Sequence, residues 1–254
     1  MLSAAAETVD PMHIDAQWHS RQGTKTPDNR DHAGIATRPG EFLGIVADGS
    51  TTGQSNGEYA CAIIRALVDW FAGTTVGVTP DGLVERLRII QQGLIADFPR
   101  GSASYVILHA AERQPVLVLH AGDTLFGKVA DRSEIQWRTE PHTLANALAK
   151  VPLPELAKLP ARHRLIRSLR SRGFIAPEVT NVDLTADTLL AATDGFWAEL
   201  SQADQMSYLD GHRCESMRGY DDCSVLCMNI TETTYPETTF SAEAAANFYV
   251  RSAS

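Results

Sequence analysis

Residues 44–53 read GIVADGSTTG, an apolar run that leads directly into Asp48 and then into small polar residues. The apolar run over 42–47 predicts a buried strand, and the Asp-Gly step predicts a turn at its end. The same pattern returns at 189–197, LLAATDGFW, where the carboxylate is that of Asp194. The sequence therefore predicts two buried strands, each of which fixes an aspartate at its end.

The segments around the first strand predict the fold class. Residues 57–73 carry apolar side chains at helical spacing, and a second helix is predicted to begin after Thr79, a capping residue followed by a first-turn proline. Between 104 and 130 the period changes to two, in short runs typical of antiparallel hairpin strands. Weaker helical segments, over about 142–150 and 154–171, precede a closing strand, helix and strand. This grouping favours an α+β fold with an antiparallel sheet core, not a doubly wound parallel sheet.

Length and composition are those of one globular domain with a large core. Of the 254 residues, 44% are apolar and 21% are charged. No segment has the roughly 20 apolar residues that span a bilayer, and the amino terminus lacks the basic start and apolar core of a signal peptide. We expect a single domain over 1–232 and a small, polar, loosely held tail over 233–254.

The charge pattern bears on the partners of the protein. The net charge is −9, and no basic run is evident. Binding to a nucleic-acid backbone needs clustered Lys and Arg, so this pattern argues against a nucleic-acid partner. We expect a monomer that binds neither nucleic acid nor membrane.

The four cysteines are too few and too irregularly spaced for a disulfide framework. They are Cys61, Cys214, Cys223 and Cys227. The last two lie four residues apart on one face of a predicted strand, and we interpret them as buried thiols, not as a metal pair. The absence of a predicted disulfide framework favours a location in the reducing cytoplasm.

Five aspartates lie at the ends of apolar runs or at turns: Asp31, Asp48, Asp123, Asp194 and Asp221. Each one alone is typical of an ordinary turn, which its side chain caps. If the strand ends converge, however, the carboxylates repel each other and raise each other's pKa, so the cluster needs a cation. Carboxylate oxygens suit Mg²⁺ or Mn²⁺, and no His-x-x-x-His or Cys-x-x-Cys pair indicates zinc.

Taken in order, these motifs resemble those of the metal-dependent protein phosphatases, the PPM or type 2C serine/threonine phosphatases, and most closely the short bacterial members. The resemblance spans roughly residues 19–230. It rests on DNRDHAG, GIVADG followed by NGEYA, GSAS, LHAGDTLFGKV, TEPHT, RLIRSL, LLAATDGFWAELS and DDCSVL. It implies two packed antiparallel sheets flanked by helix pairs, an αββα sandwich with a dinuclear Mn²⁺ or Mg²⁺ site between the sheets.

By position in these motifs, the resemblance also implies a set of metal ligands. Asp48 would bridge both ions, Gly49 would offer its carbonyl, and Asp194 and Asp221 would hold the first ion. Asp31 would bind the second ion, directly or through water.

The resemblance implies a third, weaker ion at Asp123 and Asp194. The implied reaction is hydrolysis of phosphoserine and phosphothreonine in proteins, by attack of a water that bridges two ions, with Asp48, Asp194 and Asp221 as the catalytic carboxylates. No phosphoenzyme forms, so no Cys or Ser nucleophile is needed.

The sequence departs from the family where a substrate arginine is usual. That position, three residues before Asn29, is Thr26, and the adjacent Lys25 is the candidate phosphate ligand. An ammonium lacks the two-pronged geometry of a guanidinium. The alternative for Lys25 is a solvated surface lysine.

A second departure concerns the proton donor. The loop after Asp48 is one residue longer than usual, and the family's histidine falls on Gln54, which cannot give up a proton. A water or His32 is the candidate substitute. Without a general acid, turnover of poor leaving groups is expected to be slow, since such an acid contributes roughly 10²–10⁴ in rate.

A third departure is Asp222, which follows Asp221 where the family has asparagine. Either carboxylate is a candidate ligand, and alignment without a gap favours Asp221. The alternative function is a binding or regulatory module of the same fold with weak or no activity, a pseudophosphatase, because the usual arginine and histidine are both missing.

Overall fold

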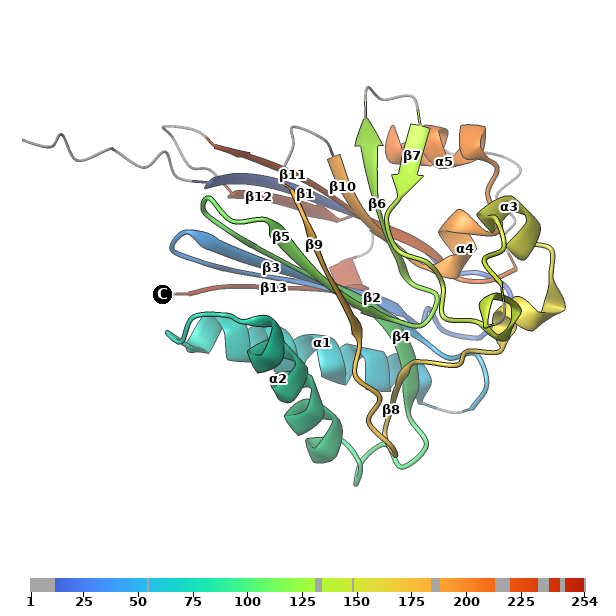
Figure 1. Ribbon diagram of the computed structural model, residues 1–254, viewed down its shortest axis with the longest axis horizontal. Coiled ribbons are helices and arrows are strands. Elements are labelled where there is room, and N and C mark those ends of the chain that lie inside the picture. The colour runs from blue at the N-terminus through green and yellow to red at the C-terminus, as the bar shows by residue number, and fades with distance from the viewer. Residues whose placement is uncertain are drawn as a thin grey trace, which may run out of the picture.

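Two β-sheets pack face to face, and helices cover the outer face of each sheet (Figure 1). The computed structural model describes residues 12–53, 55–130, 134–147, 149–183, 188–212, 220–232, 238–242 and 245–253. Within them, the predicted α+β sandwich is confirmed. No helix of these residues is both long enough and apolar enough to cross a bilayer.

The first sheet has six strands: β1 (Met12–Arg21), β6 (Leu125–Ala130), β7 (Glu134–Trp137), β10 (Thr188–Ala192), β11 (Cys223–Glu232) and β12 (Thr238–Ala242). Their order across the sheet is β12-β1-β11-β10-β6-β7. Neighbouring strands run antiparallel, except that β12 runs parallel to β1 at the edge.

The second sheet has seven strands: β2 (Asp31–Arg38), β3 (Glu41–Gly49), β4 (Ser102–Ala111), β5 (Val116–Ala121), β8 (Leu169–Arg170), β9 (Glu178–Val182) and β13 (Phe248–Ser252). The order is β13-β2-β3-β4-β5-β9, and β8 pairs with the start of β4. Here too only the edge strand, β13, runs parallel to its neighbour, β2.

Two long helices, α1 (Asn56–Gly73) and α2 (Pro80–Gly93), cover the outer face of the second sheet (Figure 1). Both were predicted, and the Thr79 hydroxyl caps α2 by accepting from the Gly82 N–H at 3.1 Å. The shorter helices α3 (Leu153–Leu156), α4 (Asp194–Trp197) and α5 (Gln202–Leu209) lie on the first sheet. Three 3₁₀ turns complete the described helices: η1 (Leu144–Asn146), η2 (Pro160–His163) and η3 (Ala245–Asn247).

Apolar side chains form three layers, one between the sheets and one under each set of helices. Between the sheets, Trp18, Val46 and Phe126 are fully buried. The outer layer of the second sheet packs Ile45 against Ile63 of α1. Each such side chain contributes about 1.5–3 kcal/mol of burial. Ile45 and Val46 are neighbours in β3 and face different apolar layers. Because both faces of β3 are buried, its sequence is one continuous apolar run.

One predicted hairpin is only partly correct. β4 and β5 form the expected antiparallel pair, but β6 leaves β5 and joins the other sheet, where it pairs with β7 and β10. The crossing begins at Gly122, whose φ is +105° and where a Cβ would lie 2.2 Å from the Ser104 Cβ. A residue with a side chain is disfavoured there both by conformation and by space.

The expectation of a loosely held tail over 233–254 is wrong for the described residues. β12 adds to β1 in one sheet and β13 adds to β2 in the other, so this segment covers an edge of both sheets. Backbone pairing holds both strands, and Phe240, Phe248 and Val250 also pack against the apolar layer between the sheets. Most residues of the segment are small or polar, so composition did not indicate these strands.

The helices expected over 142–171 are also mostly absent from the described residues. This stretch contains only η1, α3 and η2 before β8. Pro152, Pro154 and Pro160 interrupt the helical pattern, because proline donates no backbone hydrogen bond.

Candidate metal centre and cavity

Two of the predicted aspartates lie side by side at the end of the second sheet. Asp31 is the first residue of β2 and Asp48 the next-to-last residue of β3, and they are register partners in the antiparallel ladder. Directly opposed residues of this kind have Cβ atoms about 4.5–5.5 Å apart on one face. Asp31 is 1% exposed, and Asp48 is half-buried. The fully buried run before Asp48 fixes where its carboxylate lies.

The first sheet brings two more aspartates to the same place. Asp194 follows β10 as the first residue of α4, and Asp221 precedes β11. Thr193 joins the sheets, since its hydroxyl donates to Asp31 Oδ2 at 2.9 Å and its backbone N–H donates to the Ser224 carbonyl at 3.0 Å. Strand ends of both sheets therefore converge, which is the condition under which the sequence analysis expects the carboxylates to need a cation.

These residues surround a cavity of about 340 Å³. Its lining includes Asp48, Asp123, Asp194 and Asp221, and Lys25 lies beside them. Asp31 does not line the cavity and is buried behind Asp48. Gly49 is also buried, and a Cβ there would lie 2.3 Å from the Asn56 carbonyl oxygen, so only glycine fits.

The carboxylates strongly perturb each other. Burial and the charge of Asp222 raise the pKa of Asp31 well above its usual range. Burial and the charge of Asp31 do the same for the pKa of Asp48. Burial and the charge of Asp194 raise the pKa of Asp123 to about 7. Burial and then Asp221 raise the pKa of Asp194 as well. Each group therefore retains its proton to a higher pH than an isolated aspartate.

The donor set fits a divalent cation. Asp31 Oδ1 is buried and has no hydrogen-bond partner among the described residues, although a buried carboxylate oxygen ordinarily has one. The surrounding ligand atoms are carboxylate oxygens, which Mg²⁺ and Mn²⁺ prefer. A cation here relieves the repulsion and satisfies the orphaned oxygen together.

Two basic side chains partly neutralise the cluster. Arg162 Nη1 lies 2.6 Å from Asp194 Oδ2, with both side chains buried. Lys25 Nζ lies 2.8 Å from Asp221 Oδ2. Burial alone lowers the pKa of Lys25, but the hydrogen bond and charge of Asp221 outweigh it, and the pKa is raised. Lys25 is therefore a cation inside the cavity, not a solvated surface lysine.

The neighbouring pair Asp221 and Asp222 have different surroundings. Asp221 lines the cavity. The Asp222 carboxylate accepts from the backbone N–H of Gly23 and of Arg30, each at 2.8 Å. Asp222 therefore anchors the segment that carries Lys25, and Asp221 remains the one of the two that faces the cavity.

The candidates for the proton donor have separate outcomes. Gln54 lies outside the described residues. His32 is next to Asp31 in β2 and does not line the cavity, because alternate residues of a strand face opposite sides. Burial and the charge of Arg65 lower its pKa to about 4. Among the described residues, the histidine that lines the cavity is His163, which the motifs did not indicate.

Arg162 and His163 were missed, although the sequence holds a signal. Residues 162–172, RHRLIRSLRSR, contain five arginines and no acid. The expectation that the chain has no basic run is thus wrong for this stretch. Its residues Arg162, His163 and Arg170 reach the acidic site or its cavity.

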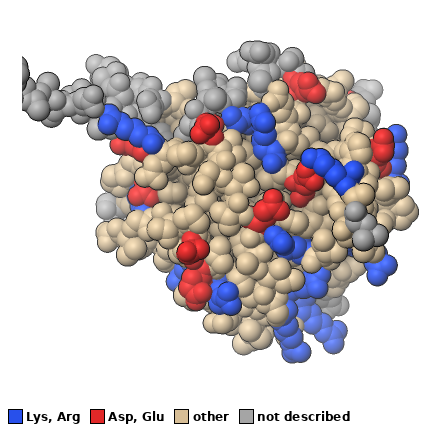
Figure 2. Space-filling view, viewed as in Figure 1, with Lys and Arg blue, Asp and Glu red and all other residues tan. Residues whose placement is uncertain are grey.

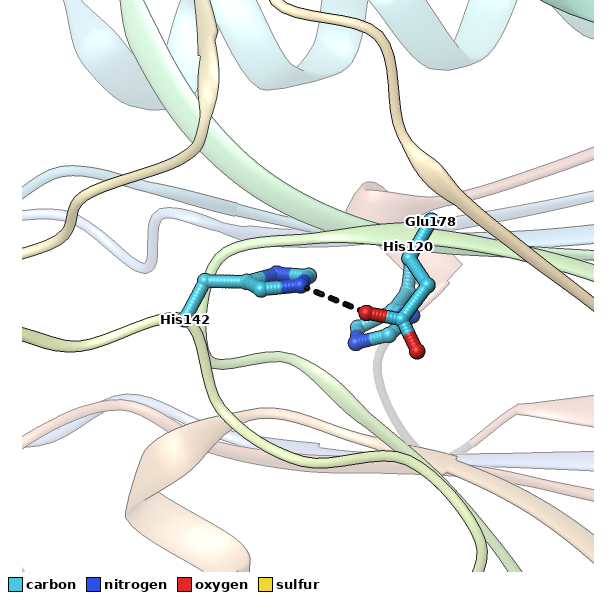
Figure 3. Close-up of side chains that lie close together, drawn as sticks. All are labelled: His120, His142 and Glu178. Carbon is cyan, nitrogen blue, oxygen red and sulfur yellow. Dashed lines mark hydrogen bonds and ion pairs between the residues drawn. The ribbon is translucent and has the colours of Figure 1, made fainter. Parts of the chain in front are cut away.

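His120, His142 and Glu178 form a cluster of side chains that lie close together (Figure 3). The backbone N–H of His142 donates to the Gly122 carbonyl at 2.8 Å, and the ring Nδ1 of His142 accepts from the Gly122 backbone N–H at 3.2 Å. Its Nε2 lies 3.1 Å from Glu178 Oε2. His142 thus holds the residue before Asp123 by two hydrogen bonds.

The ligand atoms of this cluster lie within 4.8 Å of one another. The two imidazoles, however, are stacked, with centroids 4.4 Å apart and planes 19° apart. A metal lies in the plane of each ring that binds it, so stacked rings cannot share an ion without turning. Burial lowers the pKa of both histidines, that of His120 to about 4, and the neutral rings support the backbone beside Asp123.

The thiols are as predicted where they are described. Cys223 and Cys227 are buried, and burial raises the pKa of both, that of Cys227 to about 12. Cys214 lies outside the described residues. Neither described thiol of β11 is suited to act as a nucleophile.

No protein-family model and no curated protein matches the sequence. Solved structures do match it. The serine/threonine phosphatase Stp1 from Staphylococcus aureus has a TM-score of 0.74 and 16% identity, over 90% of this chain and 99% of that chain. The S. agalactiae serine/threonine phosphatase has a TM-score of 0.71 and 18% identity, over 85% and 99%.

A third structure carries metal. The catalytic domain of the serine/threonine protein phosphatase PstP, in complex with two manganese ions, has a TM-score of 0.62 and 15% identity, over 87% of this chain and 99% of that chain. The fold of this protein is therefore that of the metal-dependent phosphatases. More particularly, it is the fold of the bacterial PPM-type serine/threonine phosphatases, as the motifs indicated.

Proposed function

We propose that this protein is a PPM-type phosphatase that hydrolyses phosphoserine and phosphothreonine in proteins with the help of divalent ions. One observation carries the proposal: four aspartates from the ends of strands in two sheets line one cavity, and a fifth carries a buried oxygen that has no partner among the described residues. A fold of this kind hosts many functions, so the proposal rests on the site.

Asp48, Asp194 and Asp221 are the proposed principal metal ligands, with the carbonyl of Gly49 beside them. Asp31, through its unpartnered Oδ1, is proposed for a second ion, and Asp123 for a weaker third one. When bound, Mn²⁺ or Mg²⁺ supplies a water nucleophile at neutral pH and polarises the phosphoryl oxygen.

The remaining steps belong to side chains of the cavity. Lys25 is proposed to bind the phosphoryl group, as a flexible cation that already lies beside the carboxylates. His163 faces the same cavity, where it is placed to exchange a proton with the leaving oxygen, directly or through water. Thr193 holds Asp31 in place through the 2.9 Å hydrogen bond to Oδ2.

A second candidate is a binding module of the same fold with weak or no activity. It is favoured by the buried ion pair between Arg162 and Asp194 and by that between Lys25 and Asp221. These cations offset part of the acidic charge without metal, as a non-catalytic protein would require.

The test compares hydrolysis of p-nitrophenyl phosphate and of a phosphothreonine peptide, with Mn²⁺, by the wild type and by Asp48→Ala. We expect turnover by the wild type alone. Calorimetric titration with Mn²⁺ separates the candidates, because the phosphatase binds the ion and gains thermal stability from it. Turnover equal to that of Asp48→Ala on both substrates would exclude the phosphatase, and absence of Mn²⁺ binding would favour the binding module.

A further inference from the structure

Two arginines line the cavity beyond the point where Asp48 pairs with Ser104 of β4. Arg170 in β8 is the register partner of Ser102 in β4, and Arg100 lies two residues before Ser102. Both arginines line the cavity, and both are exposed. We call Arg100 and Arg170 the arginine rim. The β4–β8 pair fixes the place of Arg170, and Arg100 lies in the turn that leads into β4.

Within the part of the chain that the structure describes, no carboxylate pairs with either arginine of the rim. Arg170 Nε donates to Ser168 Oγ and its Nη2 to the Leu165 carbonyl, each at 3.1 Å, so its guanidinium is oriented by neutral oxygens. Arg100 has no hydrogen-bond or ion-pair partner within the described residues. Arg162 and Lys25, by contrast, are each paired with an aspartate of the site.

The surroundings of the arginine rim add polar groups and further positive charge. The hydroxyls of Ser102 and Ser168 line the same part of the cavity and lie 3.4 Å apart. Figure 2 shows Lys and Arg side chains gathered over the end of the molecule where β8 and the start of β4 lie. This is an exception on a chain of net charge −9.

Building on the proposed function, we propose that the arginine rim binds an aspartate or glutamate next to the phosphorylated residue. The favoured substrates are then phosphoproteins that are acidic around the phosphosite. The phosphoryl group enters the carboxylate end, with its ions and Lys25, while the neighbouring carboxylate meets Arg100 and Arg170. The planar guanidinium matches a carboxylate with two parallel hydrogen bonds.

The experiment uses the full chain with Mn²⁺ and two phosphothreonine peptides of equal length. One carries Asp at the position before and at the position after the phosphothreonine, and the other carries Asn at both positions. We expect kcat/KM to be about three- to tenfold higher for the Asp peptide, mainly through KM, the size expected of two exposed charge pairs. The preference shrinks in about 1 M salt, where the Debye length falls to about 3 Å.

Variants assign the preference to the rim. In the double variant Arg100→Gln and Arg170→Gln the Asp-to-Asn ratio falls to about one. Arg251→Gln, which removes one exposed arginine from β13, is the matched control and keeps the wild-type ratio. An Asp-to-Asn ratio near one in the wild type, or an unchanged ratio in the double variant, overturns the proposal for the arginine rim. Turnover of p-nitrophenyl phosphate by the same proteins still supports the proposed phosphatase activity.

A binding measurement keeps the two proposals separate. Fluorescence anisotropy with non-hydrolysable phosphonate versions of the two peptides does not need turnover. If the wild type hydrolyses nothing but still binds the Asp peptide more tightly, and the double variant does not, the rim stands and the phosphatase fails. Equal binding of both peptides by the wild type overturns the proposed role of the arginine rim, whether or not the protein is a phosphatase.

Discussion

Asp31 and Asp48 face each other as register partners across the β2–β3 ladder, at the point where both strands reach the cavity. Like charges directly opposite in a sheet are destabilising, and burial raises the pKa of each carboxyl further. Such a pair persists because a bound cation or a retained proton offsets the repulsion. The stability of this protein is therefore expected to depend on metal and on pH together.

Asp123 makes that dependence measurable, because its pKa is raised from 3.8 to about 7. A carboxyl with a raised pKa in the folded state contributes stability that is fully present below its ordinary pKa and is lost as the pH rises through about 7. We expect the melting temperature of the metal-free protein to fall by on the order of 5–10 °C between about pH 5 and about pH 8. Differential scanning fluorimetry in chelator measures it.

The control for this prediction is Asp123→Asn. Other groups titrate in the same range, and histidines with a lowered pKa, such as His120, add stability as the pH rises. The difference between wild type and variant isolates Asp123, and saturating Mn²⁺ should remove it. Identical slopes for both proteins in chelator would contradict the assignment.

Arg162→Gln tests the buried ion pair with Asp194. Removing one partner leaves an uncompensated buried charge, so we expect the metal-free free energy of unfolding to fall by about 3–5 kcal/mol. Mn²⁺ supplies positive charge to the same carboxylate and should recover most of the loss. Urea unfolding with and without Mn²⁺ is the measurement. Arg164→Gln, an exposed arginine two residues away, is the matched control. A loss that Mn²⁺ does not change would assign Arg162 a purely structural role.

Asp221→Asn and Asp222→Asn form a matched pair that separates metal binding from anchoring. Asp221 faces the cavity, so its loss should weaken Mn²⁺ binding at least tenfold in calorimetry. Asp222 accepts from Gly23 and Arg30, so its variant should lose about 1–3 kcal/mol of stability and keep its metal affinity. The reverse pattern would make Asp222 the ligand.

The aspartates of the site were predictable because their signals are local. A buried strand that ends in Asp-Gly identifies Asp48 and Asp194 without knowledge of the fold, and both line the cavity. Apolar periodicity indicated the α+β class with an antiparallel sheet core, whereas the two packed sheets were implied only by the family resemblance. A local pattern does not indicate which sheet a strand joins. The passage of the chain at Gly122 from β5 in one sheet to β6 in the other was therefore missed.

The arginines of the site were not predictable by the same reasoning. Arg100 and Arg170 are 70 positions apart and meet only because β8 pairs with β4. Arg162 reaches Asp194 from a stretch that prolines break into single turns. The run of arginines over 162–172 marks the region but not which arginine turns inward, because that depends on tertiary packing.

The C-terminal segment supplies the last prediction, which concerns Asn247. This buried side chain accepts from Trp18 Nε1 at 3.1 Å and donates to Ser20 Oγ at 2.8 Å and to the Asp31 carbonyl at 2.7 Å. Asn247→Leu removes this partner from the Trp18 indole N–H and from the Asp31 carbonyl, whereas Ser20 Oγ keeps Asn29 and Ser224. A buried group without its partner costs about 1–3 kcal/mol, so we expect a total loss of about 2–5 kcal/mol in urea unfolding. Because one of the lost bonds holds the backbone of Asp31, Mn²⁺ affinity should fall too. Thr239→Val, which removes one exposed hydrogen bond of β12, should change both by little. If the two variants behaved alike, the segment would be held by its strands alone, and Asn247 would have no part in placing Asp31.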